Sequence, residues 1–179
     1  MKIKMIFIGL AIAIIAFLGI GFYQARELTT IQIVKSVTVK RSKEEVFNMV
    51  RYFKNFPKWS PFLAQDPTQK FEVKGNDGEV GAAYHWEGNG GKDLGYQEIK
   101  NIDPFKSIKI ECTILKPFVA NPTFDYSFNE LPNGIEVTQI FTLESGIMNA
   151  FFMWLLRVKS QMEITNQQGL DLLKKVVEK

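Results

Sequence analysis

Apolar and polar residues alternate along much of the middle of the chain, and this pattern predicts a series of β-strands. The clearest case is residues 107–115, in which the apolar positions are Ile108, Ile110, Cys112 and Ile114. Because successive side chains of a strand point to opposite faces, this segment has one apolar and one polar face. Similar runs, bounded by Gly, Pro, Asn or Asp, occupy residues 31–40, 71–73, 81–88, 95–102, 123–128 and 135–143. The sequence therefore predicts about seven strands.

A helical period replaces this alternation near the C-terminus. Apolar or small residues recur at steps of three, four or seven positions, at Phe151, Leu155, Val158, Met162, Gly169, Leu173 and Val176. This spacing places them on one stripe and predicts a single long amphipathic helix over residues 151–177. Two short helices are expected after the first strand. The first begins at Ser42, which stands three residues before Glu45 in capping-box spacing. The second is a short helical turn at residues 58–62, with an ordered loop as the alternative.

The order of these elements indicates the fold class. An amphipathic helix and a sheet with one apolar face each need a partner, and the two can cover each other. We therefore predict an α+β domain, in which a curved antiparallel sheet wraps around the long C-terminal helix and leaves a cavity between them.

The N-terminal segment has a different character from the rest of the chain. Residues 5–23 carry no charge, and at about 1.5 Å per residue a helix of this length matches the ~30 Å hydrocarbon layer of a bilayer. A cleaved signal peptide would have a shorter apolar region, of about 7–15 residues, and a small residue where Tyr23 stands. We predict an uncleaved single-pass transmembrane anchor at residues 1–23, a linker at 24–30 and a ligand-binding domain at 31–179.

Charges on either side of this segment predict its orientation. Lys2 and Lys4 precede the apolar run, whereas Arg26 after it is offset by Glu27. The positive-inside rule then places the N-terminus in the cytoplasm and the domain on the extracytoplasmic side of the cell membrane. The short linker would hold the domain close to the membrane surface.

Composition excludes several classes of partner. The net charge is +3, but without Lys2 and Lys4 only 20 of the 22 basic residues remain against 19 acidic ones, so the domain is nearly neutral. A nucleic-acid-binding protein would carry a basic stripe. The single cysteine allows no internal disulfide, and no Cys/His metal spacing or Gly-rich phosphate loop occurs. We expect no nucleic acid, no metal and no cofactor.

Several short motifs resemble those of a known superfamily. They are Glu45-Val46-Phe47, Trp59-Ser60-Pro61, GAAYHWEGN at 81–89, Asp103-Pro104, Lys116-Pro117-Phe118, Val137-Thr138 and Gly169-Leu170. Together with the order of elements over residues 31–179, they resemble the helix-grip fold of the START-like (SRPBCC) superfamily, most of all its polyketide cyclase/dehydrase-type branch. The resemblance implies a fold that hosts lipid carriers, hormone receptors and cyclases. Gln139 departs from the pattern, because relatives often carry an aromatic residue there.

Candidates for catalysis are weak. His85 is the only histidine, and strand parity puts it opposite Tyr84 and Trp86, so it faces solvent if those two face a cavity. Glu98 is a candidate buried carboxylate of raised pKa, with a surface position as the alternative. Cys112 faces inward among isoleucines, where a thiol is usually inert.

An excess of inward-facing aromatic residues indicates a ligand cavity, with an ordinary packed core as the alternative. The predicted lining residues are Trp59, Tyr84, Trp86, Tyr126, Phe128, Gln139, Phe141, Met162 and Gly169. The tyrosine hydroxyls and the Gln139 amide need hydrogen-bond partners inside, which a ligand or water can supply. Gly169 leaves a gap in the helical stripe.

Residues 146–156 (GIMNAFFMWLL) are apolar around every side of a helix start. Near a bilayer, Phe152 and Trp154 are predicted to rest at the membrane interface beside the cavity mouth, with Arg157 and Lys159 at the headgroups. Burial inside the domain, against the aromatic residues of 56–62, is the alternative.

These observations favour a membrane-anchored, non-enzymatic binding domain, a carrier or sensor that takes up a lipid or other hydrophobic small molecule. Two other hypotheses stay open. One is a cyclase-, dehydrase- or isomerase-type enzyme that acts on an apolar substrate through Glu98 or His85. The other is a structural partner in a membrane complex. The oligomeric state is also open.

Overall fold

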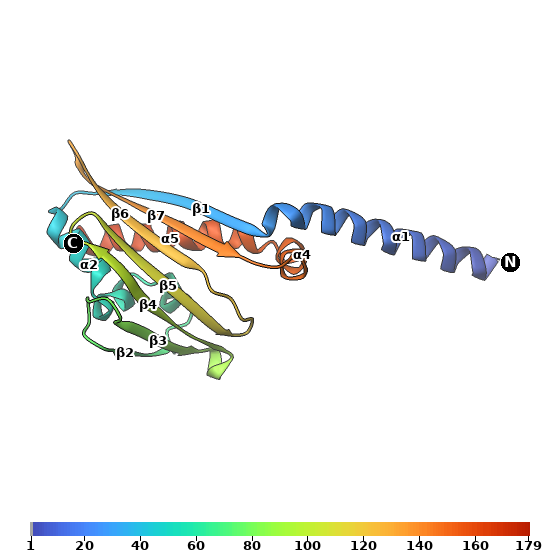
Figure 1. Cartoon of the computed structure of the whole chain (residues 1–179), viewed down its shortest axis with the longest axis horizontal. Helices are drawn as coiled ribbons and strands as arrows, with labels where there is room; N and C mark the ends of the chain where they lie inside the picture. Colours follow the sequence, from blue (N-terminus) through green and yellow to red (C-terminus); the bar gives the residue numbers. More distant parts are fainter. Residues whose placement is uncertain (1) are drawn as a thin grey trace.

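The computed structural model describes residues 2–179 and consists of an N-terminal helix followed by a domain of sheet and helices (Figure 1). The elements, with η for a 3-10 turn, are α1 (Lys2–Ala25), η1 (Arg26–Leu28), β1 (Thr30–Val39), α2 (Lys43–Arg51), η2 (Phe53–Lys58), α3 (Pro61–Gln65), β2 (Lys70–Lys74), β3 (Ala83–Gly88), η3 (Asn89–Gly91), β4 (Asp93–Asp103), β5 (Ser107–Lys116), β6 (Thr123–Leu131), β7 (Gly134–Glu144), α4 (Ile147–Leu155) and α5 (Val158–Val177). The side chain of Lys2, used above to orient the chain, lies outside the described residues.

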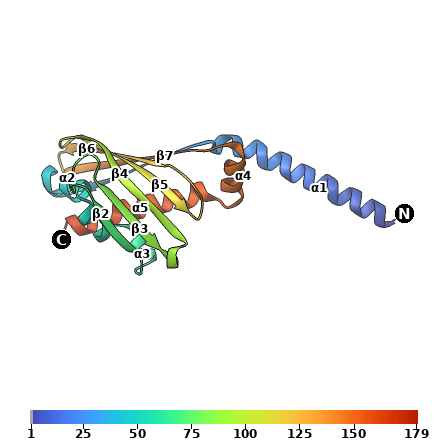
Figure 2. The same ribbon diagram turned by 60° about the horizontal axis from the view of Figure 1, so that its bottom comes forward.

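All seven strands belong to one antiparallel sheet, in the order β1-β7-β6-β5-β4-β3-β2. Strands β2 to β7 follow one another as neighbours, and β1 returns to pair with β7, from Thr30 opposite Glu144 to Val39 opposite Ile135. The sheet curves around α5, which lies along its inner face (Figures 1 and 2). This arrangement confirms the predicted helix-grip fold.

The first short helix after β1 forms as expected, whereas the second, α3, runs from Pro61 to Gln65 and not over residues 58–62, because Ser60 caps it and Pro61 stands at its first position. At the start of α2, the backbone N–H of Ser42 donates to Glu45 Oε2 at 3.1 Å and that of Glu45 donates to Ser42 Oγ at 3.3 Å, which completes a capping box. The helix buries Val46, Phe47 and Val50. The ring of Phe47 meets that of Phe128 at 5.2 Å, so this helix closes one end of the space between the sheet and α5.

The C-terminal helix is not continuous, which corrects the prediction of one helix over 151–177. It breaks between α4 and α5, where Arg157 has a left-handed backbone conformation with φ +54°. The two helices point in different directions, as Figures 1 and 2 show. Apolar residues keep the helical spacing on both sides of the break because each helix needs an apolar face. The face of α4 packs on α1, whereas that of α5 packs on the sheet.

The partner of α4 is α1. Ala25 and Ala150 are fully buried where the two helices meet, together with Phe151. The Phe151 ring stacks on that of Phe22 with centroids 4.8 Å apart. The segment from Lys4 to Leu28 has a mean hydropathy of 2.7 and is long and apolar enough to cross a membrane, a property that membrane spans share with signal sequences.

Candidate functional site

A cavity of about 680 Å³ lies between the inner face of the sheet, α5 and the short helices before β2. Its volume is within the range of about 300–1,000 Å³ that is common for small-molecule sites. Aromatic side chains form much of its wall, among them Trp59, Trp86, Phe124 and Phe141. A ligand bound there would be held mainly by removal of apolar surface from water.

A buried pair of polar side chains crosses the inner face of the sheet. Tyr126 and Gln139 lie directly opposite each other on β6 and β7, and Gln139 Nε2 donates a hydrogen bond to the Tyr126 hydroxyl at 2.6 Å. The pair satisfies one end of the Gln139 amide. The other end, Oε1, is buried and has no partner among the described residues.

Further polar atoms on the cavity wall share this property. Within residues 2–179, the buried atoms without a hydrogen-bond partner are Tyr84 Oη, Gln97 Nε2, Gln139 Oε1, Ser145 Oγ and Asn166 Nδ2, and all five residues line the cavity. Buried polar groups in proteins are normally paired with protein or water, so these atoms mark where a ligand or ordered water would bind.

These polar groups are neutral at physiological pH. Burial raises the pKa of the Tyr84 and Tyr126 hydroxyls well above the usual value for tyrosine, so both stay protonated. Burial also raises the pKa of the Cys112 thiol, on the same wall, to about 12. The described wall contains no Lys, Arg or His; its two charged residues are Asp93 and Glu144. Asp93 Oδ1 accepts a hydrogen bond from Trp86 Nε1 at 2.9 Å.

The structure places all but one of the predicted lining residues on the cavity wall. The exception is Phe128. Its side chain lies on the inner face of the sheet, as expected, but at a position on β6 beyond the end of the cavity. At that position α2 fills the space, and the Phe128 ring packs on Phe47 within the core. Strand parity gives the face of a residue but not its distance from the end of the cavity.

Comparison with known proteins agrees with this fold. Residues 30–178 match the model of a family described as polyketide cyclase / dehydrase and lipid transport. The chain belongs to this family. The matched residues cover the whole domain from β1 to the end of α5 and leave α1 outside. No curated protein matches the chain significantly.

Solved structures show the same fold at low sequence identity. Protein CV1439 from Chromobacterium violaceum has 16% identity and a TM-score of 0.58, over 83% of this chain and 98% of that one. SA2116 from Staphylococcus aureus, a protein of unknown function, has 13% identity and a TM-score of 0.58, over 84% and 97%. The di-domain ARO/CYC StfQ from the steffimycin biosynthetic pathway has 10% identity and a TM-score of 0.58, over 83% of this chain and 51% of that one. At such identities the likeness establishes the fold.

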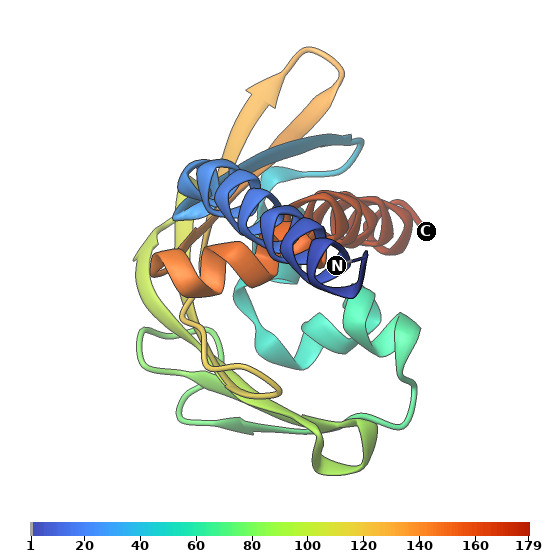
Figure 3. The ribbon, with the colours of Figure 1, turned by 90° about the vertical axis from the view of Figure 1, so that its right-hand side faces the viewer.

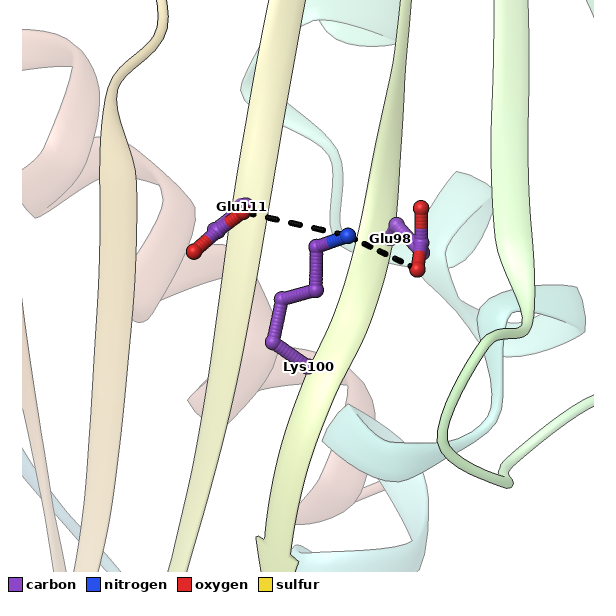
Figure 4. A network of polar contacts seen from close by, with 3 residues as sticks. All are labelled: Glu98, Lys100 and Glu111. Atoms are coloured by element: carbon purple, nitrogen blue, oxygen red, sulfur yellow. Dashed lines mark hydrogen bonds and ion pairs between the residues drawn. The ribbon is translucent and has the colours of Figure 1, made fainter.

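Neither candidate catalytic residue lies on the cavity wall of this family member. His85 is on the outer face of β3, where its ring stacks on that of Tyr96 at 5.2 Å. Glu98 is on the outer face of β4, with an oxygen 2.9 Å from Lys100 Nζ; the same ammonium lies 3.8 Å from Glu111 (Figure 4). Among the described residues, no three His, Cys, Asp or Glu side chains gather as metal ligands.

A β-bulge in β4 changes the face on which the residues after Glu98 lie. The register shifts between Ile99 and Asn101, so that Lys100 is an extra residue in β4. Ile102, which simple alternation puts on the face of Glu98, therefore packs against the core on the inner face.

Two cavity residues that sequence reasoning missed carry a usable signal. Gln97 is buried between the inward-facing positions Gly95 and Ile99, so strand parity alone would have found it. Asn166 stands four residues after Met162 and three before Gly169, on the same helical stripe. Both are polar residues at apolar positions, and such positions often mark a site.

A glycine on β4 positions the Trp86 indole. Gly95 lies opposite Trp86 in the strand register, and a Cβ on Gly95 would clash with the Thr113 carbonyl oxygen and lie 2.5 Å from Trp86 Cζ2. Only a residue without a side chain lets the indole lie against the strand and reach Asp93.

Replacement of Gly169 by alanine tests whether the predicted gap in α5 exists. The new methyl group would meet the Pro61 ring at 3.4–3.5 Å, an ordinary van der Waals distance. We expect the free energy of unfolding to rise by up to about 1 kcal/mol, because alanine is the better helix former. Urea unfolding in detergent micelles measures this, and a loss of stability would show that Pro61 cannot accept the methyl group.

Proposed function

We propose that this protein is a membrane-anchored carrier or sensor that binds an uncharged, largely apolar molecule in the cavity between sheet and helix. The observation that carries the proposal is the combination of an aromatic wall with five buried polar atoms that have no partner among the described residues. A purely apolar ligand would leave these atoms unpaired, at a cost of about 1–3 kcal/mol each. The family description, which includes lipid transport, supports the same reading.

The charges of the wall favour a neutral ligand over an anionic one. An acidic headgroup in this cavity would share the wall with the carboxylates of Asp93 and Glu144, and the described wall has no cationic side chain to pair with it. Burying an unpaired carboxylate costs several kcal/mol. Hydroxyl, carbonyl and amide groups can instead pair with Tyr84, Gln97, Gln139 and Asn166, which offer both donors and acceptors.

Contacts of α1 support its retention as an anchor. A signal peptide removed after secretion would leave the apolar face of α4 uncovered, where Ala150 and Phe151 now pack on Phe22 and Ala25. With the positive-inside rule, the domain would lie on the extracytoplasmic side of the membrane.

Native mass spectrometry of the full chain, released from lipid nanodiscs, tests this function, with organic extraction to identify any adduct. We expect a stoichiometric adduct of one uncharged lipid class. In competition at pH 8, a long-chain alcohol should displace it at least tenfold better than the fatty acid of equal length. A clean protein mass after incubation with a total lipid extract, or equal displacement by the acid, would refute the proposal.

An enzyme of the cyclase or dehydrase kind is the second candidate, and one observation favours it. The Tyr84 hydroxyl faces the cavity and has no partner among the described residues, and it stays protonated because burial raises its pKa. It is therefore available to donate a hydrogen bond to a substrate oxygen on which negative charge develops. Chemical identity of the extracted molecule before and after prolonged incubation separates the two. An unchanged ligand supports binding, and a product that Tyr84→Phe abolishes supports catalysis.

A further inference from the structure

We propose that the mouth of the cavity is immersed in the headgroup region of the bilayer, so that the ligand passes into the protein directly from the leaflet at which α1 ends. This inference rests on the proposed function for its ligand, but its geometric part can be tested without one.

The mouth lies at the end of the domain where α1 joins it. Four apolar side chains both line the cavity and are largely exposed: Phe118 (70%) and Val119 (70%) in the loop between β5 and β6, and Phe152 (52%) and Leu156 (51%) at α4. We call these four residues the rim. Figure 3 shows the loop at 117–122 below α4, and α4 packs on the end of α1 that joins the domain. An apolar rim of this kind marks a contact surface.

The packing of α4 on α1 gives the depth of the part of the rim that α4 contributes. The rings of Phe151 and Trp154 reach Phe17, with centroids 6.4 and 5.7 Å apart. Phe17 precedes Tyr23, the last residue of the predicted anchor, by about 9 Å along a helix with a rise of about 1.5 Å per residue. If residues 5–23 span the hydrocarbon layer, the side chains of α4 that touch Phe17 reach into that layer.

The composition of α4 fits this depth. Residues 146–156 carry no charge, and the charged Arg157 and Lys159, both exposed, follow directly after the helix. Helices that lie in the interface bury an apolar face about 5–10 Å into the boundary between headgroups and acyl chains. The occupant of the rim is therefore the membrane itself, in continuity with α1. Phe152 lies on the surface in contact with lipid, whereas Trp154 packs against Phe17 of α1.

Site-directed spin labels on the full chain in phosphatidylcholine vesicles measure the depth of the rim. Single-cysteine variants Val119→Cys and Phe152→Cys, in a Cys112→Ala background, are compared with Val80→Cys. Val80 is similarly exposed (60%) but lies in the β2–β3 connection. It stands two residues after Gly78, whose carbonyl oxygen accepts a hydrogen bond from Arg51 at the end of α2. At positions 119 and 152 we expect molecular oxygen to relax the spin label more than a water-soluble nickel chelate does. At position 80 we expect the nickel chelate to relax the label more than oxygen does.

Each alternative has its own signature in this experiment. Equal exposure to nickel at 119, 152 and 80 would mean that the rim lies in water, and would overturn the proposal. Protection of 119 and 152 from both reagents would mean that a protein surface covers the rim, and would overturn it as well.

A glycine in α1 provides a second test of the geometry. A Cβ at Gly21 would clash with the Phe151 ring and lie 2.9 Å from Trp154 Cζ3, whereas a Cβ at Gly19 would meet nothing within 4 Å. Gly21→Leu should therefore separate α4 from α1 and make the label at 152 accessible to nickel, and Gly19→Leu should not. Unchanged depth in Gly21→Leu would show that the α1–α4 contact does not position the rim.

Ligand uptake then links depth to function. We expect Phe118→Asp and Val119→Asp to slow uptake from vesicles at least tenfold, while the thermal midpoint stays as in the Val80→Asp control. Unchanged uptake in both rim variants would overturn the direct route. If no variant or parent binds a lipid at all, the proposed function fails, while the spin-label depths still report on the rim.

Discussion

Gly95→Ala is expected to destabilise the domain by about 1–3 kcal/mol, the usual cost of overpacking a filled interior. The methyl group would have to displace either the Thr113 carbonyl oxygen, which is backbone, or the Trp86 indole. The indole is a side chain and can move more easily than backbone, so we expect it to leave the cavity wall and lose its hydrogen bond to Asp93. The observable results are a lower unfolding midpoint in urea, a shifted tryptophan emission and a ligand affinity reduced at least tenfold.

Gly146→Ala is the matched control for this substitution. A Cβ at Gly146 would meet nothing within 4 Å, and its backbone is extended, with φ −70° and ψ 160°. This variant should retain parent stability to within about 0.5 kcal/mol, as surface substitutions usually do. If Gly95→Ala also retained parent stability and affinity, the close approach of Trp86 to β4 would not be what shapes the cavity.

Gln139→Leu is expected to lower both stability and affinity, and a double-mutant cycle separates the two effects. The single change leaves the buried Tyr126 hydroxyl without its partner, at a cost of about 1–3 kcal/mol. In Tyr126→Phe/Gln139→Leu, both polar groups are replaced by apolar ones, so we expect stability to return to near the parent value. Affinity for the ligand should stay at least tenfold low in both variants, because the acceptor at Gln139 is gone.

Urea unfolding in micelles and ligand titration measure the cycle. Recovery of stability without recovery of affinity would assign the polar pair to ligand binding. Recovery of both would assign it to the core alone and contradict the proposed role of Gln139.

Local pattern was sufficient to predict most of the fold. Alternation along β5 placed Ile108, Ile110 and Cys112 on the buried face, where the structure has them, and the Ser42–Glu45 spacing located the start of α2. Such features depend only on neighbours in sequence, and their order, together with the short motifs, carries the resemblance to the family. The cavity residues on β3, β6 and β7 followed from the same parity.

The features that the sequence pattern could not predict depend on contacts between segments far apart in the chain. The break at Arg157 has no local marker, since the residue is neither Gly nor Asn, the types that adopt φ > 0 most readily. The hydrophobic period placed Phe151 and Leu155 on one stripe, but Phe151 is buried and Leu155 is exposed. The helix that buries Phe151, α1, lies more than a hundred positions away along the chain. The extra residue Lys100 in β4 likewise becomes visible only when the register with β5 is known.

The pairing of β1 with β7 has a consequence for synthesis of the protein. The two strands are separated by roughly a hundred residues, which at roughly 5–20 residues per second take roughly 5–20 s to translate. Until β7 leaves the ribosome, the apolar residues Ile31 and Ile33 of β1 have no strand beside them. An unpaired apolar edge is a template for aggregation, and here it would be held next to the membrane by α1. Nascent chains should therefore depend on a chaperone that shields β1 during this interval.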